Sequence, residues 1–280
     1  MVTRDESAVT ARRISRAVVL ARGLGTRMRH GDAAAALDPG QASMADAGLK
    51  VLMPVGRPFL DYVIASLADA GIDDVCLVIG AEHQVIRDRY ERDCPPGRVR
   101  VHYAVQDAPL GTAHAVLAAA DFIGDHDILV VNGDNLYPRA ALEAVLRAAP
   151  PSLAAFGATA LTADGLIEPE RIAAFALVDV DARGFLRDIV EKPPLEAVCG
   201  RDHRVSVNLW AFTPGIVDAC ARIPRSPRGE FELPDAVRYL MRDLGIPVTA
   251  VAVDAPVIDL STRADIARVR ERLAGIEVRL

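Results

Sequence analysis

Short apolar runs alternate with amphipathic stretches through the first half of the chain. Runs rich in Val, Ile and Leu have the length of strands and fall at 17–21, 74–80, 99–105 and 128–134. Stretches with helical spacing lie at 59–71, 83–92, 111–123 and 139–149. Because strands and helices that alternate in this way form parallel sheets with right-handed crossovers, the pattern predicts an α/β fold.

Pro150-Pro151 separates this half from a second one that is richer in strands and less regular. Further strands are predicted at 153–159, 171–181, 185–193, 205–214 and 248–260, with a turn at 182–184. Helices are predicted at 215–222 and 233–244, and a last helix opens at Ser261-Thr262, with Asp265 in position for a capping interaction. We therefore expect a mixed, mainly parallel central sheet.

These patterns suggest one domain, residues 17–280, with a first half at 17–150 and a second at 151–280. Residues 1–16 are polar and rich in arginine, and we expect them to form a flexible tail. No apolar run approaches the roughly 18 residues of a membrane helix, and the N-terminus lacks the apolar segment of a signal peptide. The expected location is the cytoplasm, without membrane contact.

Charge and cysteine content exclude several classes of function. The net charge of −6 argues against a nucleic-acid partner, because proteins that follow phosphate backbones usually carry a basic excess. The four cysteines are widely spaced and include no Cys-x-x-Cys pair, so neither a zinc site nor a disulfide framework is indicated. Free thiols, buried or close to solvent, are the simpler interpretation. The sequence permits a homo-oligomer but does not require one.

Lysine is nearly absent from the chain. Of the 32 basic residues, 30 are arginine, and only Lys50 and Lys192 are lysine. A compact ammonium group and a planar guanidinium are not interchangeable at a phosphate, so these two positions are candidates for phosphate chemistry. Chance placement is the alternative.

The segment LARGLGTRM, residues 20–28, follows the first predicted strand. Gly23 and Gly25 allow backbone N–H groups to approach a phosphate, and Arg27 adds a cation. A dinucleotide-binding fingerprint would need glycine or alanine where Met28 stands, which weakens a nicotinamide-binding interpretation. Taken alone, the segment could also be an ordinary strand-to-helix turn.

Six more segments follow this one in order: GLKVLMPVGRPFLDYVIASL, QDAPLGTAHAV, VVNGDN, VEKP, VNLWAF and VIDLST. Together, over about residues 17–265, they resemble the sugar-1-phosphate nucleotidylyltransferase family. The resemblance implies the Rossmann-like three-layer sandwich of nucleotide-diphospho-sugar transferases. It also implies a magnesium-dependent transfer of a nucleoside monophosphate from a nucleoside triphosphate to a sugar 1-phosphate, with release of pyrophosphate.

The resemblance assigns roles to individual residues. The catalytic residues would be Arg27, Lys50 and Lys192. The nucleotide would be bound by Leu20, Ala21, Gly23, Gly25, Thr26, Gln106, Gly111, Thr112 and Asp134. The sugar phosphate would be bound by Glu191, Lys192, Asn208 and Trp210. Asp134 and Asp259 would hold Mg²⁺, the only cofactor expected. UTP and dTTP are favoured as the nucleotide, although the sequence does not fix the base.

Several positions depart from the family pattern. About a dozen extra residues lie within the stretch 30–48, which is rich in alanine and glycine and is expected to be a mobile flap or a small helix near the nucleotide. Ala176, Trp210 and Val257 replace residues that are common in the family, so we expect a reshaped sugar pocket. Trp210 could instead be a core residue.

Other functions remain open at this point. A cytidylyltransferase that acts on phosphocholine or a polyol phosphate shares the opening motif. A nucleotide-sensing homologue without catalysis is a second alternative, although it would not need both Asp134 and Asp259. A dinucleotide oxidoreductase is a more distant third.

Overall fold

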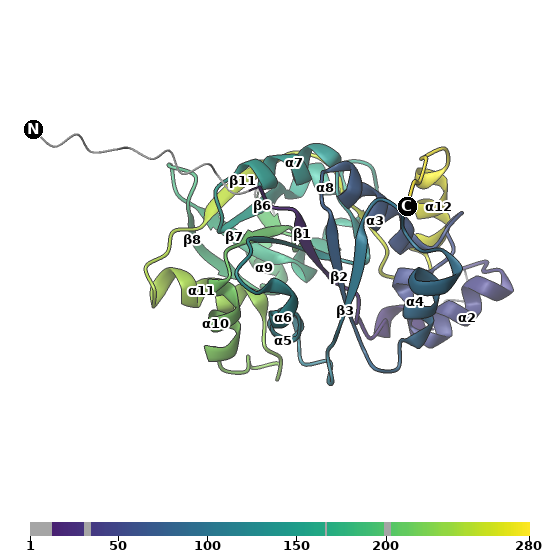
Figure 1. The fold of residues 1–280 in the computed structure, drawn as a ribbon. Coiled ribbons are helices and arrows are strands. Elements are labelled where there is room, and N and C mark those ends of the chain that lie inside the picture. The colour runs from purple at the N-terminus through teal and green to yellow at the C-terminus, as the bar shows by residue number, and fades with distance from the viewer. Residues whose placement is uncertain (1–12, 31–34, 166, 199–202) are drawn as a thin grey trace, which may run out of the picture.

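A computed structural model describes residues 13–30, 35–165, 167–198 and 203–280. Four parallel strands in the order β3-β2-β1-β4 form one side of a ten-stranded sheet (Figure 1). They are β1 (Arg16–Leu20), β2 (Asp74–Ile79), β3 (Arg100–Val105) and β4 (Ile128–Asn132). Each coincides with one of the apolar runs of the first half, so the predicted parallel sheet is confirmed.

Helices cover both faces of this sheet. One apolar core contains residues of α3 (Phe59–Asp69), α7 (Arg139–Arg147) and α12 (Asp265–Leu273). The other contains residues of α5 (Thr112–Ala118), α6 (Ala120–Ile123), α10 (Gly215–Arg222) and α11 (Leu233–Arg242). Both faces are apolar because successive side chains of a strand point to opposite faces of the sheet. In β1, for example, Val19 belongs to the first core and its neighbour Val18 to the second. The predicted three-layer sandwich is thus confirmed.

The second half completes the sheet with strands that pair mainly in antiparallel fashion. It supplies β6 (Ser152–Gly157), β7 (Ala176–Val180), β8 (Leu186–Val190), β9 (Arg204–Ser206), β10 (Trp210–Phe212) and β11 (Thr249–Val253). Strand β10 lies antiparallel between β4 and β6, and β11 lies parallel to β6. One sheet therefore runs through both halves, and it is mixed as expected.

Three predicted strands are shorter or broken. The stretch 171–181 is a 3₁₀ helix up to Ala174 and a strand only from Ala176. The stretch 205–214 divides into β9 and β10 because Asn208 has a φ of 55°, which a continuous strand cannot contain. The stretch 248–260 divides into β11 and the short β12 (Ile258–Asp259), which leaves the main sheet and pairs with β5 (Asn135–Leu136).

The remaining helical elements are short. They are α1 (Thr26–Arg29), α2 (Pro39–Ala47), a 3₁₀ helix at Lys50–Leu52, α4 (Gln84–Asp88) with a π-helical turn at Arg89–Asp93, α8 (Ala158–Thr162) and α9 (Leu195–Val198). The carboxylate of Asp265 accepts hydrogen bonds from the backbone N–H groups of Ser261 (3.0 Å) and Thr262 (2.7 Å), as predicted. However, α12 begins at Asp265 and not at Ser261-Thr262, so these bonds stabilise the turn that precedes the helix.

The boundary of the predicted tail needs correction. Residues 1–12 lie outside the described residues, but residues 13–16 belong to the fold. Ile14 is buried in the first core, and Arg16, the first residue of β1, donates a hydrogen bond to the carbonyl oxygen of Phe122 at 2.7 Å. The arginine-rich composition predicts a tail, but composition alone does not show whether an apolar residue between charged ones, such as Ile14, is buried.

The cysteines that the structure describes are free thiols. Cys76 and Cys220 are buried, and burial raises the pKa of each to about 12, so both stay protonated at neutral pH. Cys199 lies outside the described residues. Among the helices of the described residues, none has both the length and the apolar character needed to cross a membrane.

Candidate active site

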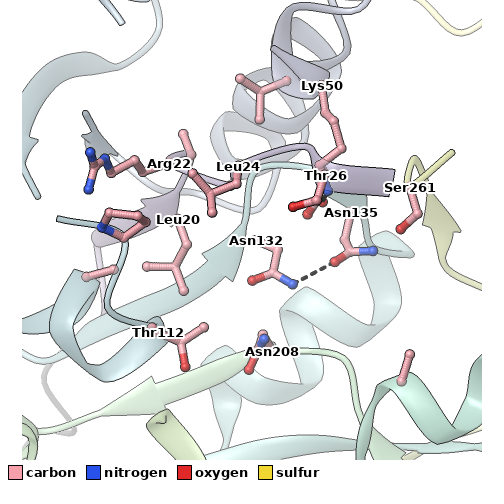
Figure 2. Close-up of a pocket in the computed structure, with 18 of the residues that line it drawn as sticks. Leu20, Arg22, Leu24, Thr26, Lys50, Thr112, Asn132, Asn135, Asn208 and Ser261 are labelled. Carbon is pink, nitrogen blue, oxygen red and sulfur yellow. Dashed lines mark hydrogen bonds and ion pairs between the residues drawn. The ribbon is translucent and has the colours of Figure 1, made fainter. Parts of the chain in front are cut away.

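A cleft of about 400 Å³ opens beyond the carboxyl ends of the parallel strands (Figure 2). Open α/β sheets bind their ligands at this edge, and the volume suits a small ligand. Residues from both halves of the chain line the cleft. Fourteen predicted site residues are among them: Leu20, Ala21, Gly23, Thr26, Arg27, Lys50, Gln106, Gly111, Thr112, Asp134, Glu191, Lys192, Asn208 and Asp259. Gly25 and Trp210 are not.

The loop after β1 forms one wall of the cleft. Gly25 has a φ of 58°, and a Cβ atom at this position would collide with the carbonyl oxygen of Gly48. Gly25 therefore shapes the loop instead of lining the cleft. Gly23 does line the cleft, and a Cβ atom there would come within 3.7 Å of Cε of Lys50.

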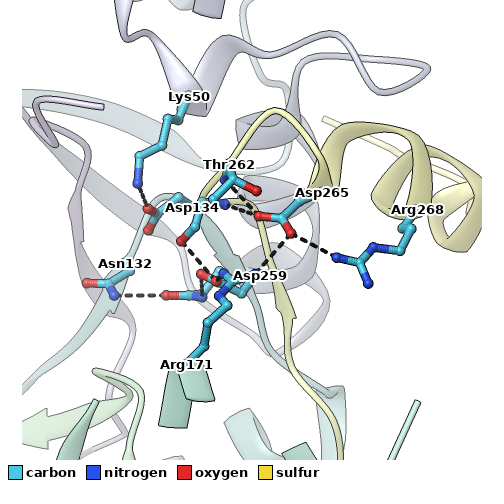
Figure 3. Close-up of polar contacts among 10 residues, drawn as sticks. Lys50, Asn132, Asp134, Arg171, Asp259, Thr262, Asp265 and Arg268 are labelled. Carbon is cyan, nitrogen blue, oxygen red and sulfur yellow. Dashed lines mark hydrogen bonds and ion pairs between the residues drawn. The ribbon is translucent and has the colours of Figure 1, made fainter. Parts of the chain in front are cut away.

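Lys50 and Asp134 form an ion pair at the end of β4 (Figure 3). The side chains are 16% and 19% exposed, so water screens the pair only weakly. Burial acts to lower the pKa of Lys50, but the adjacent carboxylate of Asp134, assisted by Asp259, outweighs it and the net shift is upward. Lys50 is thus held as a cation inside the cleft.

Asp259 reaches the same place from a segment more than 120 residues later in the chain. In the β12–β5 pair, Asp259 lies opposite Asn135, and the backbone N–H of Leu260 donates to the carbonyl oxygen of Asp134 at 3.0 Å. The carboxylate of Asp259 accepts hydrogen bonds from Asn135 Nδ2 (2.8 Å) and Ser261 Oγ (2.9 Å), and it forms an ion pair with Arg171.

The carboxylates of Asp134 and Asp259 therefore lie close enough to repel each other. Burial and repulsion from Asp134 raise the pKa of Asp259 above its ordinary value, and Arg171 opposes that shift. Mg²⁺ commonly binds one or two carboxylates and completes its shell with water and substrate phosphates. In the described part of the chain, no group of three or more His, Cys, Asp and Glu side chains could hold a metal ion. Asp134 and Asp259 fit a magnesium site that also uses phosphate oxygens.

Gln106 lies at the end of β3, and its side chain has a defined orientation. Its amide Nε2 donates to the carbonyl oxygen of Gly111 at 3.0 Å, and Nδ1 of His114 lies 3.1 Å away. A carbonyl oxygen can only accept, so the amide nitrogen must face Gly111. No described residue donates to Oε1 of Gln106, which leaves an acceptor for a ligand.

The loop beyond Gln106 packs directly against the start of α11. Gly111 has a φ of 104°, and a Cβ atom would collide with the carbonyl oxygen of Phe231. The hydroxyl oxygen of Thr112 accepts a hydrogen bond from the backbone N–H of Leu233 at 2.9 Å. Both residues line the cleft and also fix the loop in place.

Glu191, Lys192 and Asn208 lie where the second half borders the cleft. Burial raises the pKa of Glu191 to about 7, and the neighbouring carboxylates of Glu232 and Glu230 add to that effect. Arg228 lies 3.6 Å from Glu191. Lys192 is exposed, and its backbone, like that of Asn208, has a positive φ, a conformation that is uncommon outside glycine.

The structure places Trp210 in the core and not in the cleft. Its side chain is fully buried, stacks on Phe212 with ring centroids 5.5 Å apart, and donates from Nε1 to Oδ1 of Asn208 at 3.1 Å. The prediction of a direct sugar contact is therefore replaced by an indirect role, in which Trp210 orients Asn208. Val257 is also fully buried, whereas Ala176 lines the cleft.

The stretch 30–48 contains helix α2. Asp38 and Gln41 form a reciprocal capping box at its start, and Gly48 ends it with a φ of 73°. Residues 31–34 lie outside the described residues. Gly48 lines the cleft, so the prediction of a small helix near the site is confirmed.

Arg22, Asn135 and Arg171 are among the cleft residues that sequence reasoning missed. Arg22 and Asn135 stand inside quoted motifs, next to residues that were selected, so closer attention to their side chains would have found them. Arg171 had no such signal, because its ion pairs with Asp259 and with Asp265 (2.9 Å) depend on long-range packing.

Comparison with known proteins agrees with this architecture. A family model described as nucleotidyl transferase matches residues 16–254. The low-salt glycan biosynthesis nucleotidyltransferase Agl11 of Haloferax volcanii is 29% identical over 243 residues, 86% of this chain and 60% of that protein. A glucose-1-phosphate thymidylyltransferase of Streptomyces griseus is 31% identical over 241 residues, 85% of this chain and 60% of that protein. The chain thus spans about three fifths of the length of these two relatives.

A solved structure shares the fold. The UDP-glucose pyrophosphorylase from Acinetobacter baumanii superimposes with a TM-score of 0.71, at 20% identity and with 95% of each chain covered. The architecture is therefore the nucleotide-diphospho-sugar transferase α/β fold.

Proposed function

The chain belongs to the nucleotidyl transferase family, and from this premise we propose that it transfers a nucleoside monophosphate from a nucleoside triphosphate to a sugar 1-phosphate. The products are a nucleotide sugar and pyrophosphate. The observation that carries the proposal is the meeting of Lys50, Asp134 and Asp259 in one cleft that Gln106 and Glu191 also line.

The reaction requires no protein nucleophile. A phosphate oxygen of the sugar 1-phosphate attacks the α-phosphorus, and the bond from that phosphorus to the oxygen bridging the α- and β-phosphates breaks in line, so pyrophosphate leaves with the bonding electrons. Arg27 and Lys50 stabilise the negative charge that builds on the departing pyrophosphate. Lys192 neutralises the phosphate of the incoming sugar and holds it in position for attack.

Asp134 and Asp259 would hold Mg²⁺. Bound there, the ion would neutralise phosphate charge and orient the reacting oxygens. Both carboxylates already have cationic partners, Lys50 and Arg171, and those partners limit the repulsion between the two acids before substrate arrives.

Uracil or thymine suits the orientation of Gln106. The free Oε1 of Gln106 accepts a hydrogen bond, and both bases carry an N–H group at N3 that can donate one. The name of the Streptomyces griseus relative, a thymidylyltransferase, supports the same choice.

A sugar is the expected acceptor because Glu191 and Asn208 provide acceptor oxygens for hydroxyl groups. The name of the Streptomyces griseus relative specifies glucose 1-phosphate. The small side chain of Ala176 in the cleft is the remaining ground for expecting a modified pocket, since Trp210 and Val257 are core residues.

Substitution of Arg27 tests this proposal. The side chain is exposed in the cleft, so Arg27→Ala should fold normally while its kcat falls by about 100-fold or more, as when other fixed transition-state contacts are removed. Arg139→Ala, which removes an exposed arginine on α7 outside the cleft, is the matched control. Full activity of Arg27→Ala would refute the assignment.

A further inference from the structure

Arg22 follows β1 and lines the cleft, but the proposed mechanism does not use it. Its side chain is only 8% exposed. Nη2 lies 3.1 Å from one carboxylate oxygen of Glu82 and 3.4 Å from the other. The two other guanidinium nitrogens, Nε and Nη1, are buried and have no hydrogen-bond partner among the described residues.

A buried cation with two unused donors is unfavourable unless something completes its hydrogen bonds. Glu82 supplies only part of what is needed, because its side chain is 53% exposed and an ion pair with such a partner is weak. Both nitrogens are shielded from solvent in the structure, so a ligand in the cleft with acceptor atoms would satisfy them after the Arg22 side chain turns toward it.

The position of Arg22 identifies the part of the substrate that it would meet. In Figure 2, Arg22 lies on the opposite side of the cleft from Lys50 and Ser261, which belong to the phosphate end. The backbone of Ala21 bonds to Val78 (2.9 Å), and that of Gln106 bonds to the next residue of β2, Ile79 (2.9 Å). Arg22 and Gln106 therefore flank the same strand end, at the base side of the cleft.

We propose that Arg22 determines base specificity by donating a hydrogen bond to a carbonyl oxygen of the nucleobase. This carbonyl group would adjoin the ring N–H that donates a hydrogen bond to Oε1 of Gln106. This inference rests on the proposed function. It selects bases in which a ring N–H adjoins a carbonyl, namely uracil, thymine and guanine. In cytosine and adenine the corresponding ring nitrogen is unprotonated and would face the Gln106 oxygen as a second acceptor, so these bases are disfavoured.

The test measures dissociation constants by calorimetry for UTP, dTTP, GTP, CTP, ATP and inorganic tripolyphosphate, with the wild-type chain and with Arg22→Ala. The wild type should prefer one or more of the first three nucleotides over CTP and ATP. Arg22→Ala should weaken the preferred nucleotide by about tenfold or more, which is the usual loss for a hydrogen bond to a charged group. It should change binding of CTP and tripolyphosphate by less than about threefold.

Two further variants make the result interpretable. Arg100→Ala removes an arginine that is 71% exposed and outside the cleft, and it should bind all six ligands as the wild type does. Arg22→Lys keeps the charge but not the planar donors, so its selectivity should fall between wild type and alanine; it also serves if the alanine variant does not fold.

An equal loss for tripolyphosphate would overturn the inference, since Arg22 would then be a phosphate ligand. Unchanged selectivity in both Arg22 variants would also overturn it. Neither result depends on catalysis, because the assay contains no sugar phosphate. Failure of the proposed function would instead appear in a separate assay with sugar 1-phosphates, where a chain with normal nucleotide selectivity would release no pyrophosphate.

Discussion

Burial and neighbouring charges together set the pKa values of individual residues in this cleft. The carboxyl group of Glu191 is the clearest example, because burial and two nearby acids move its pKa to about 7 from an ordinary value of 4.5. It therefore changes charge near neutral pH, at the position where we expect the sugar to bind. Lys50 shows the opposite balance, since its carboxylate neighbours keep it charged despite burial.

Glu191→Gln should stabilise the protein in a pH-dependent way. Between pH 4.5 and 7 the folded chain holds a proton on Glu191 that the unfolded chain has lost, so the contribution of this group to stability falls as pH rises. Glutamine cannot ionise. The variant should match wild type near pH 4.5 and exceed its free energy of unfolding by up to about 3 kcal/mol at pH 8.

Urea unfolding at pH 5, 6.5 and 8 measures this difference. The control is Glu143→Gln on α7, where Arg139 lowers the pKa of an exposed carboxyl group, so no gain in stability at high pH is expected. A Glu191→Gln difference that stays constant across the three pH values would contradict the assignment.

Lys50→Met should abolish most of the activity. The substitution removes the cation that pairs with Asp134 and that we propose binds the triphosphate, so kcat should fall by about 100-fold to 1000-fold while the dissociation constant of the acceptor changes little. Lys50→Arg should not restore the rate, because the larger planar group does not fit the same space. Steady-state kinetics would measure both variants, and rescue by arginine would show that only charge matters.

At this scale the sequence predicts residues whose role follows from a motif. The motifs predict Lys50, Asp134 and Asp259 as site residues, and all three meet in the cleft. Trp210 and Arg171 show the limit. Whether a tryptophan packs in the core or lines a pocket depends on the strand pairing around it, and the partner of Arg171 depends on where β12 leaves the sheet.

At the scale of elements, the cleft depends on contacts between loop ends and helix starts. The first N–H groups of a helix have no partner within the helix. At α11 the backbone N–H of Leu233 donates to the hydroxyl oxygen of Thr112, the first residue of α5. Thr112 therefore fixes the loop that follows Gln106 relative to α11.

Thr112→Val should lower the free energy of unfolding by about 1–2 kcal/mol, because valine keeps the shape and removes the acceptor. Thr112→Ser retains the hydroxyl and is the matched control. Equilibrium unfolding of both variants would measure the effect. Equal stability of the valine and serine variants would show that the bond to Leu233 contributes nothing.

Periodicity predicts elements well only where they are regular. The helix at 215–222 has the predicted bounds, and the apolar runs of the first half are all strands. The stretch 205–214 reads as one strand because its residues favour strands, yet Asn208 adopts a positive φ that no hydrophobic pattern reveals. Site residues interrupt regular structure here, so errors of prediction gather at the cleft.

For the whole molecule, the question is how the two halves are held together around the cleft. Strand β10 joins them within the sheet, and the β5–β12 pair brings Asp259 to Asp134. Tyr137 adds a third link. Its buried hydroxyl lies 2.6 Å from the carbonyl oxygen of Val207 and 3.1 Å from that of Asn208, and it accepts from the N–H of Asn132 at 3.3 Å.

Tyr137→Phe should cost about 1–3 kcal/mol of stability, since it leaves buried backbone groups of both halves unpaired. It should also raise the KM for the acceptor, because Asn208 loses its support, while nucleotide affinity stays nearly constant. Tyr62→Phe is the control, because the Tyr62 hydroxyl has one long bond, 3.4 Å, to Val55 within the first half. Similar effects in both variants would argue against a link between the halves.

The sequence predicts the fold class but not the order of strands. Alternation of strand and helix indicates a layered α/β fold, and the motifs indicate the edge that binds ligand. The insertion of β10 between β4 and β6 brings together residues about 60 to 80 positions apart, and no local pattern encodes that pairing. The continuity of the cleft across both halves could be learned only from the structure.

The central claim is that both halves of this cleft act on one reaction, and pyrophosphate release tests it most directly. The full chain is incubated with Mg²⁺, each common nucleoside triphosphate and a panel of sugar 1-phosphates. We predict release that requires Mg²⁺ and both substrates, is greatest with UTP or dTTP, and yields one nucleotide sugar for each pyrophosphate. Release without any sugar phosphate, or no release with any pair, would contradict the account.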